Sequence, residues 1–148
     1  MDLANLREVG PDLYVGSEFS PEHPPPPGRW SLVVDLYGTW TKGDKERYRR
    51  ARRVISAPFQ DGTPIPAGFL DRILQEVLTA RPLGPVLVHC QAGFSRSPSV
   101  AYALLRVMDG LDPHTALARA RMPETPEYPM PRTLAAARQW ADRQQRVR

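Results

Sequence analysis

The chain has 148 residues, 41% of them hydrophobic, and a formal net charge of +4 at pH 7. This size and composition are typical of one globular domain, which we expect to span residues 1–148, and no apolar stretch is long enough to cross a membrane. The single cysteine excludes an internal disulfide, and no spacing of cysteines and histidines suggests a metal site. We therefore expect a cytoplasmic protein that needs no cofactor and has no membrane or nucleic-acid partner.

Apolar runs alternate with turn-forming residues in the first part of the chain. Residues 11–17 and 30–36 predict two buried strands, separated by a stiff surface loop that contains Pro24–Pro27. Residues 42–53 form a charged run that ends with the basic segment Arg49–Arg53. We interpret this run as a solvated short helix that leads into a strand, and a docking surface for acidic or phosphorylated partners is the alternative.

Strands and helices alternate through the rest of the chain. The strand-like residues 53–59 run into a turn sequence that begins with Asp61, and residues 86–88 predict a buried strand. Apolar residues at helical spacing predict four helices, over residues 66–81, 100–108, 112–121 and 133–145. This alternation indicates an α/β fold with a mainly parallel central sheet flanked by helices.

The loop at residues 90–96 joins a predicted strand to a predicted helix and carries the chemistry. It begins with Cys90 and ends with Arg96. Because the first N–H groups of a helix lack partners and the helix dipole is positive there, a phosphate-sized anion is stabilised at this point. The same field favours the nucleophilic thiolate form of Cys90. Arg96 can hold two phosphoryl oxygens, Ser97 can donate a hydrogen bond to the sulfur, and Gly93 allows a tight turn.

The motif His-Cys-x-x-Gly-x-x-Arg-Ser at residues 89–97 resembles the phosphate-binding loop of the cysteine-dependent protein tyrosine phosphatases. The Pro-Ser pair and the aliphatic helix after it resemble the dual-specificity branch, as do the core strands at residues 13–17 and 31–36. The resemblance assigns phosphate binding to Gln91, Ala92, Gly93, Phe94, Ser95 and Arg96. Because neighbouring strand residues face opposite ways, we expect His89 to support the loop from the side away from the phosphate.

The resemblance also implies a two-step reaction without a metal. Cys90 attacks phosphorus and forms a cysteinyl-phosphate while an acid protonates the leaving oxygen, and water then hydrolyses the intermediate. The family's acid is an aspartate on an upstream loop, and Asp61 is our choice because it lies at the expected strand-to-loop junction. The alternative for Asp61 is an ordinary surface turn residue. The less well placed candidates are Asp35, Asp44 and Asp71.

Three other roles for Cys90 stand beside the catalytic one. They are a buried core cysteine, a silent loop that only binds phosphorylated partners, and a sulfur-transferase loop. The complete motif argues against the first role, and the intact Cys90 and Arg96 argue against the second. The histidine before the cysteine and the Arg-Ser pair after the loop argue against the third.

We expect a phosphatase that hydrolyses phosphomonoesters, with phosphotyrosine as the main substrate and phosphoserine and phosphothreonine as further ones. Phe94 would supply an aromatic wall that favours an aryl phosphate. The loop has none of the lysines that inositide-phosphatase relatives use for extra phosphates. The partner is accordingly a phosphorylated protein or a small phosphomonoester. The alternatives are a non-protein substrate, such as a phosphoinositide, a nucleotide or an RNA 5′ phosphate, and a non-catalytic phospho-binding module.

Overall fold

The computed structural model describes residues 5–146, so residues 1–4 and 147–148 of the expected domain lie outside the description. One sheet runs through the molecule, in the strand order β1-β2-β5-β3-β4. Its strands are β1 (Arg7–Gly10), β2 (Leu13–Gly16), β3 (Leu32–Asp35), β4 (Val54–Ser56) and β5 (Val86–His89). The pairs β2–β5, β5–β3 and β3–β4 are parallel, whereas β1 pairs antiparallel with β2. The prediction of an α/β fold with a mainly parallel central sheet is confirmed.

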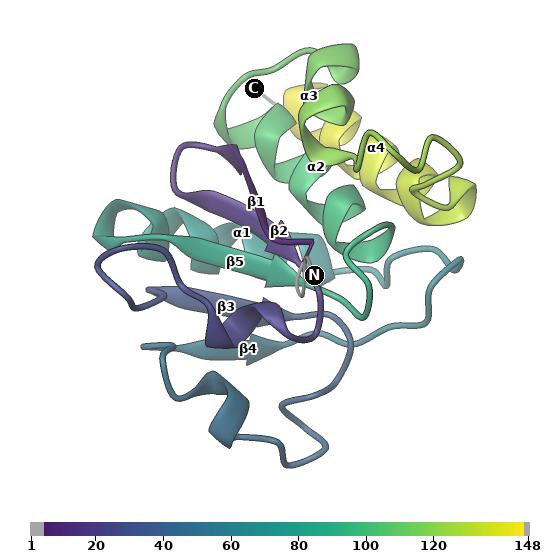
Figure 1. Cartoon of the computed structure of the whole chain (residues 1–148). Helices are drawn as coiled ribbons and strands as arrows, with labels where there is room; N and C mark the ends of the chain where they lie inside the picture. The colour runs from purple at the N-terminus through teal and green to yellow at the C-terminus, as the bar shows by residue number, and fades with distance from the viewer. Residues whose placement is uncertain (1–4, 147–148) are drawn as a thin grey trace.

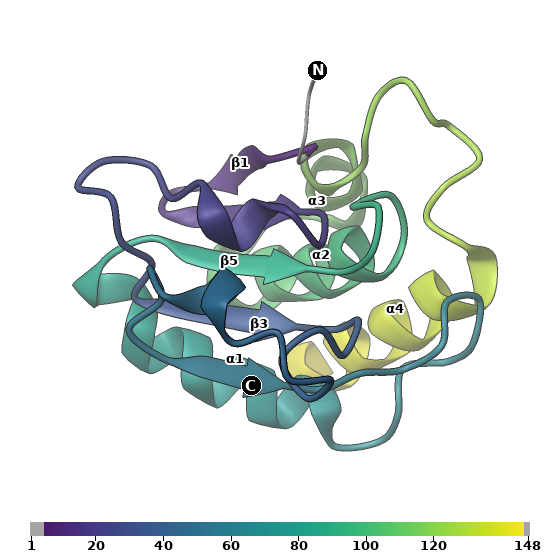
Figure 2. The same cartoon turned by 60° about the horizontal axis from the view of Figure 1, so that its bottom comes forward.

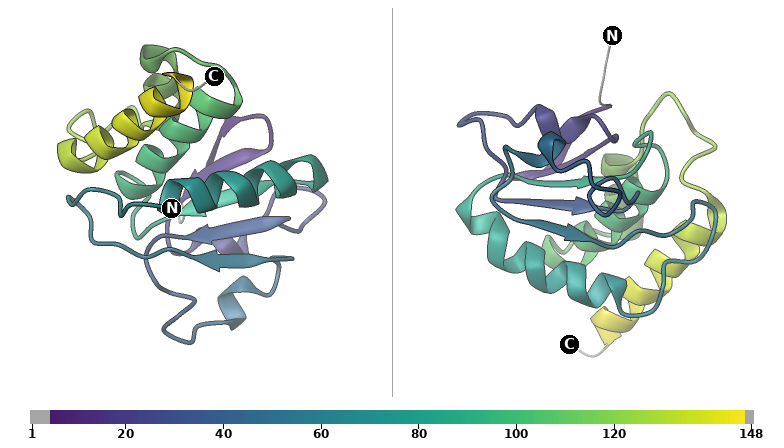
Figure 3. Two further views of the ribbon diagram at one scale, coloured as in Figure 1. Left: turned by 180° about the vertical axis from the view of Figure 1, so that it is seen from behind. Right: turned by 90° about the horizontal axis from the view of Figure 1, so that it is seen from below.

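Four helices flank this sheet, as the apolar spacing predicts. They are α1 (Phe69–Ala80), α2 (Arg96–Met108), α3 (Pro113–Ala120) and α4 (Pro131–Arg146), and the short 3-10 helices are η1 (Ser20–Glu22), η2 (Glu46–Tyr48) and η3 (Arg81–Leu83). Helices α1 and α2 pack on one face of the sheet, and α3 and α4 pack on α2 (Figures 1 and 3). Helix α2 is therefore the centre of the helical layer, and its first turn adjoins the loop that carries Cys90.

The strands bury both faces of the sheet because successive side chains point to opposite sides. Val34 and Val88 lie in the large core under the helices. Their neighbours Val33 and Leu87 pack on the other face in a second cluster with Trp30. Both faces of the central strands are therefore apolar, and this explains why β3 and β5 read as continuous apolar runs rather than as alternating ones.

Strand β1 is the element that the sequence analysis does not predict. Its four residues show no clear alternation, and it forms a hairpin with β2 through the turn at residues 10–13. The Gly10-Pro11-Asp12 sequence is the signal that indicates such a turn, since these residues favour tight reversals of the chain. The positive φ of Asp12, 54°, agrees with that turn.

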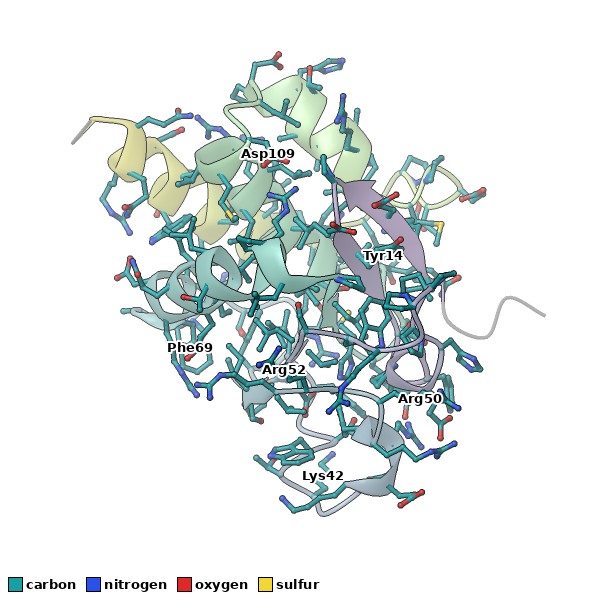
Figure 4. All side chains as sticks on the ribbon, turned by 90° about the vertical axis from the view of Figure 1, so that its left-hand side faces the viewer. Tyr14, Lys42, Arg50, Arg52, Phe69 and Asp109 are labelled. Atoms are coloured by element: carbon teal, nitrogen blue, oxygen red, sulfur yellow. The ribbon has the colours of Figure 1, made fainter. Side chains whose placement is uncertain are left out.

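The charged run at residues 42–53 contains the short helix η2 and leads into β4, as interpreted from the sequence. It is less solvated than expected, because Tyr48 is only 2% exposed and packs in the second cluster. Arg53 forms a bidentate pair with Glu76 at 2.8 Å. Arg50 and Arg52 precede β4 and thus lie at the end of the sheet opposite to the carboxyl ends of the parallel strands (Figure 4). A docking surface there stays a hypothesis, and it would lie away from Cys90.

The carboxyl ends of β2, β3 and β5 meet at one edge of the sheet, where the loops that follow them also lie (Figure 2). Ligands of open α/β sheets bind at this edge. No helix within residues 5–146 combines the length and the apolar character that crossing a membrane requires.

Candidate active site

Cys90 is the first residue after β5 and faces the start of α2. Its side chain is 2% exposed, and its Sγ lies 3.3 Å from the Oγ of Ser97. The Ser97 hydroxyl also lies 3.3 Å from the carbonyl oxygen of Gly16 on β2. A hydroxyl has one proton, so Ser97 donates to one of these two acceptors at a time. A thiolate at Cys90 can only accept, and it would draw that proton toward the sulfur.

The carbonyl groups of the loop are turned away from its centre by donors outside it. The oxygen of Gln91 accepts from the N–H of Glu18 at 2.9 Å, and the oxygen of Ala92 accepts from Nδ2 of Asn5 at 2.7 Å. The oxygen of Gly93 accepts from Nη2 of Arg7 at 3.4 Å. In a planar trans peptide the next N–H points opposite to the carbonyl. The N–H groups of residues 92–94 therefore point to the other side, toward the loop centre.

These inward N–H groups are free to bind a ligand. Within residues 5–146, no backbone or side-chain acceptor pairs with the N–H groups of residues 91–95. They precede the first turn of α2, where the helix dipole adds positive potential. Successive unpaired N–H groups that converge on one point form a concave anion site. The anion-binding role of the loop stays a prediction, and this geometry suits it.

Arg96 supplies the charged part of this site. Its side chain is 8% exposed, and its Nη1 donates to the carbonyl oxygen of Phe59 at 2.9 Å. Its buried Nε has no hydrogen-bond partner among the described residues. The guanidinium carbon lies 5.4 Å from the ring centre of Tyr37. The bond to Phe59 fixes the guanidinium plane and leaves the Nε edge available for a bidentate contact with two oxygens.

The sequence-predicted residues come together around one small pocket of about 80 Å³. It is lined by residues 90–92 and 94–96 of the loop, together with Asp61 and Tyr128. Asp61 follows β4, is exposed, and accepts a local hydrogen bond from the N–H of Gly62 at 2.9 Å. Sites for drug-sized ligands run to roughly 300–1,000 Å³, so this pocket suits a small group such as a phosphoryl.

Gly93 is a position where the backbone needs glycine. Its φ is +88°, and a Cβ there would lie 3.0 Å from the carbonyl carbon of Gly16. A side chain would meet both a strained backbone conformation and the backbone of β2. The tight turn expected at Gly93 is therefore a close contact between the loop and the neighbouring strand.

Comparison with solved structures identifies the fold. Human DUSP28 matches with 20% identity over 95% of each chain and a TM-score of 0.75. PTPMT1 in complex with PI(5)P matches with 15% identity over 96% of this chain and 97% of that one, at a TM-score of 0.72. A variant of P. aeruginosa TpbA in complex with pTyr matches with 20% identity over 93% and 82%, at 0.65. This chain has the fold of the cysteine-dependent tyrosine and dual-specificity phosphatases. No protein-family model matches it, and no curated protein does.

In this phosphatase fold, the side chain of His89 contacts the backbone at the start of the loop. The side chain is fully buried; its Nδ1 lies 3.1 Å from the Cys90 carbonyl oxygen and its Nε2 lies 2.8 Å from the Tyr48 hydroxyl. A carbonyl only accepts, so Nδ1 carries a proton, and in a neutral ring Nε2 then accepts from Tyr48. Burial lowers the pKa of His89. The negative charge of Asp35, whose Oδ1 lies 3.5 Å from Nε2, raises the pKa, but burial has the larger effect. We infer a neutral imidazole that supports the loop, on the side away from the pocket as expected.

The lowered pKa of His89 gives a testable dependence of stability on pH. Below about pH 6.5 the unfolded chain binds a proton on this histidine that the folded chain does not, so the free energy of unfolding should fall as the pH falls. The slope from this residue approaches about 1.4 kcal/mol per pH unit. Chemical denaturation between pH 7.5 and 5.5 should show a flatter slope for His89→Asn than for the parent. Equal slopes in His89→Asn and the parent would contradict the neutral assignment.

Asp35 supports the backbone of the loop after β3. It is fully buried, and its carboxylate accepts from the backbone N–H groups of Tyr37, Gly38 and Trp40 at 2.8–2.9 Å. These three bonds shape the loop after β3, which brings the Tyr37 ring to the guanidinium of Arg96. Asp71 also has a structural contact, since its Oδ1 accepts from Nε1 of Trp140 at 2.8 Å.

The sequence analysis misses two residues that hold the loop and one that supports His89. Asn5, two residues before β1, and Arg7, the first residue of β1, hold loop carbonyls, and Tyr48 supports His89 from the charged run. Asn5 and Arg7 carry no local motif, because their partners are chosen by the fold. Tyr48 had a weak signal as the one aromatic residue among charged neighbours at residues 42–53. Within the described residues, no three histidine, cysteine or carboxylate side chains group closely enough to hold a metal ion.

Proposed function

We propose that this protein is a phosphatase that hydrolyses phosphomonoesters through a cysteinyl-phosphate on Cys90. One observation carries the proposal: a buried cysteine, an arginine with a free guanidinium edge, a ring of unpaired N–H groups and an aspartate all border the same pocket. A core cysteine would need none of these neighbours. The phosphatase fold found in the comparisons supports the same chemistry.

In the first step, the Cys90 thiolate attacks phosphorus as the phosphorus–oxygen bond to the leaving group breaks. The N–H groups of residues 91–95 and the guanidinium of Arg96 stabilise the charge that spreads over the equatorial oxygens. The Asp61 carboxyl gives its proton to the leaving oxygen, which departs as an alcohol or phenol. The sulfur–phosphorus bond then stores the phosphoryl group on the protein.

In the second step, water attacks the phosphorus of this intermediate. The Asp61 carboxylate accepts a proton from that water, and the sulfur–phosphorus bond breaks. Cys90 leaves as a thiolate, which the hydroxyl of Ser97 can stabilise from 3.3 Å. Inorganic phosphate and the original form of the enzyme result, so the cycle is balanced without a metal or a cofactor.

The rim of the pocket supports phosphotyrosine as the substrate, with phosphoserine and phosphothreonine as further ones. Phe94 and Tyr128 form a tilted aromatic pair with ring centres 5.8 Å apart, and Tyr128 lines the pocket. Two aromatic rings at the mouth offer contacts to the phenyl ring of an aryl phosphate. Arg96 is the single cation among the lining residues, so the pocket offers little to a second phosphate.

A phosphoinositide is the alternative substrate, because PTPMT1 in complex with PI(5)P shares this fold. The two candidates separate in one assay of phosphate release. We expect a higher kcat/KM for a phosphotyrosine peptide than for a soluble PI(5)P. The opposite order would favour the lipid headgroup, and phosphotyrosine binding with no turnover of either substrate would indicate a non-catalytic phospho-binding module.

Asp61→Asn tests the acid–base role directly. We expect kcat/KM for phenyl phosphate, whose leaving group needs a proton, to fall by ~10²-fold or more. The loss for p-nitrophenyl phosphate should be much smaller, since nitrophenolate leaves without full protonation. The assay is run with a chelator, and parent-like values for both substrates would reassign the acid.

A further inference from the structure

The start of α4 contacts both loops of the candidate site. The backbone N–H of Met130, one residue before the helix, donates to Oγ of Ser95 in the phosphate-binding loop at 3.0 Å. The hydroxyl of Thr133, in the first turn of α4, donates to the carbonyl oxygen of Thr63 at 2.8 Å. Thr133 is fully buried, and Thr63 lies two residues after Asp61. A short segment of α4 therefore ties the loop of Cys90 to the turn of Asp61.

The turn that carries Asp61 has few other ties to the fold. Within it, the hydroxyl of Thr63 and the N–H of Thr63 both donate to the carbonyl oxygen of Gln60, at 2.5 and 3.3 Å. Asp61 itself accepts only from its neighbour Gly62 among the described residues. These bonds close the turn on itself, but they do not fix where the turn stands relative to Cys90.

Long-range hydrogen bonds on both sides of the turn fix that position. On the side before Asp61, the N–H of Phe59 donates to the carbonyl oxygen of Leu36 at 3.4 Å, and Arg96 donates to the carbonyl oxygen of Phe59 at 2.9 Å. On the side after it, Thr133 donates to Thr63. The closed turn is thus held at one end by the loop that binds phosphate and at the other by α4. Because a misplacement of ~1 Å can cost ~10²-fold in rate, both anchors matter for an acid that must meet the leaving oxygen.

We propose that Thr133 is a positioning residue for the Asp61 carboxyl. This inference rests on the proposed function, since it takes Asp61 as the group that protonates the leaving oxygen. The hydroxyl of Thr133 touches neither substrate nor the reacting atoms. It acts through the backbone of Thr63 and holds the turn at the distance that proton transfer needs.

Thr133→Val tests this role, because valine keeps the shape of threonine and removes the donor. We expect kcat/KM for phenyl phosphate to fall about tenfold or more, and kcat/KM for p-nitrophenyl phosphate to change much less. The quantity kcat/KM covers the steps up to release of the leaving group and excludes hydrolysis of the intermediate. A lower fraction of folded protein scales both substrates equally, so their ratio isolates the position of the acid. Thr133→Ser keeps a hydroxyl and should restore the parent ratio.

The two variants separate the role of Thr133 from the assignment of Asp61 as the acid. If Asp61→Asn changes the substrate ratio and Thr133→Val leaves it at the parent value, Thr133 has a purely structural role and the inference is wrong. If Asp61→Asn also leaves the ratio unchanged, the assignment of the acid fails and the inference fails with it. If Thr133→Val does not fold, Thr133→Ala removes the same donor and is measured in the same way, with the same two outcomes.

Discussion

Replacing Cys90 by serine should lower kcat for p-nitrophenyl phosphate by at least ~10⁴-fold, because the variant loses the nucleophile on which both steps depend. A serine hydroxyl stays protonated at neutral pH and is a far weaker nucleophile than a thiolate. Among the described residues, the hydrogen-bond partner of the sulfur is the hydroxyl of Ser97 at 3.3 Å, which is itself a weak acid and not a base. The steady-state rate under reducing conditions measures the loss.

The control for Cys90→Ser is binding without turnover. The variant differs from the parent by one atom, and it keeps the unpaired N–H groups of residues 91–95 and the guanidinium of Arg96. Titration calorimetry should therefore show that inorganic phosphate still binds. Turnover comparable to that of the parent would show that another group is the nucleophile.

Arg96→Lys should lower kcat/KM by ~10³-fold, although the charge is kept. A lysine ammonium is a point charge and cannot present two parallel donors to two oxygens. It also leaves the carbonyl oxygen of Phe59 without the donor that lies 2.9 Å away in the parent. The loss corresponds to about 4 kcal/mol of transition-state stabilisation. Kinetics with p-nitrophenyl phosphate, together with the inhibition constant of inorganic phosphate, measure it.

Arg72→Lys is the matched control for Arg96→Lys. Arg72 is exposed on α1, and its Nη1 donates to the carbonyl oxygen of Ser56 at 3.3 Å, outside the pocket. We expect its kcat/KM to stay at the parent value. If Arg96→Lys lowers the melting temperature and leaves kcat/KM unchanged, then Arg96 serves the fold and the proposed role in transition-state stabilisation is incorrect.

The parts of this fold that sequence reasoning predicts are those whose signals are local. Strand β5, the loop after it and helix α2 follow one another within residues 86–108, and apolar spacing alone separates them. The phosphate-binding residues lie within this one segment, so its motif predicts them together. The choice of Asp61 as the acid also starts from a local signal, a strand-like run followed by a turn sequence that begins with Asp61, together with the family resemblance, and it stays a prediction.

The parts that sequence reasoning misses depend on contacts between distant segments. Asn5 and Arg7 reach the loop from 87 and 86 residues away, and Thr133 reaches Thr63 from 70 residues away. The residues next to each of these donors in the sequence form no motif that would single it out. Their partners are backbone carbonyls, which leave no trace in the sequence. The fold has to bring the segments together before such a contact exists.

In the proposed mechanism the phosphoryl group passes through a covalent bond to Cys90. Mixing Asp61→Asn with p-nitrophenyl phosphate tests this step, because nitrophenolate leaves readily while the missing base slows hydrolysis of the intermediate. A denaturing quench and mass spectrometry of the intact protein should then show the added mass of one phosphoryl group, and peptide mapping should assign it to Cys90. Nitrophenol should appear in a burst of about one equivalent per enzyme. A phosphoryl group on another residue, or steady turnover with neither burst nor adduct, would contradict the mechanism.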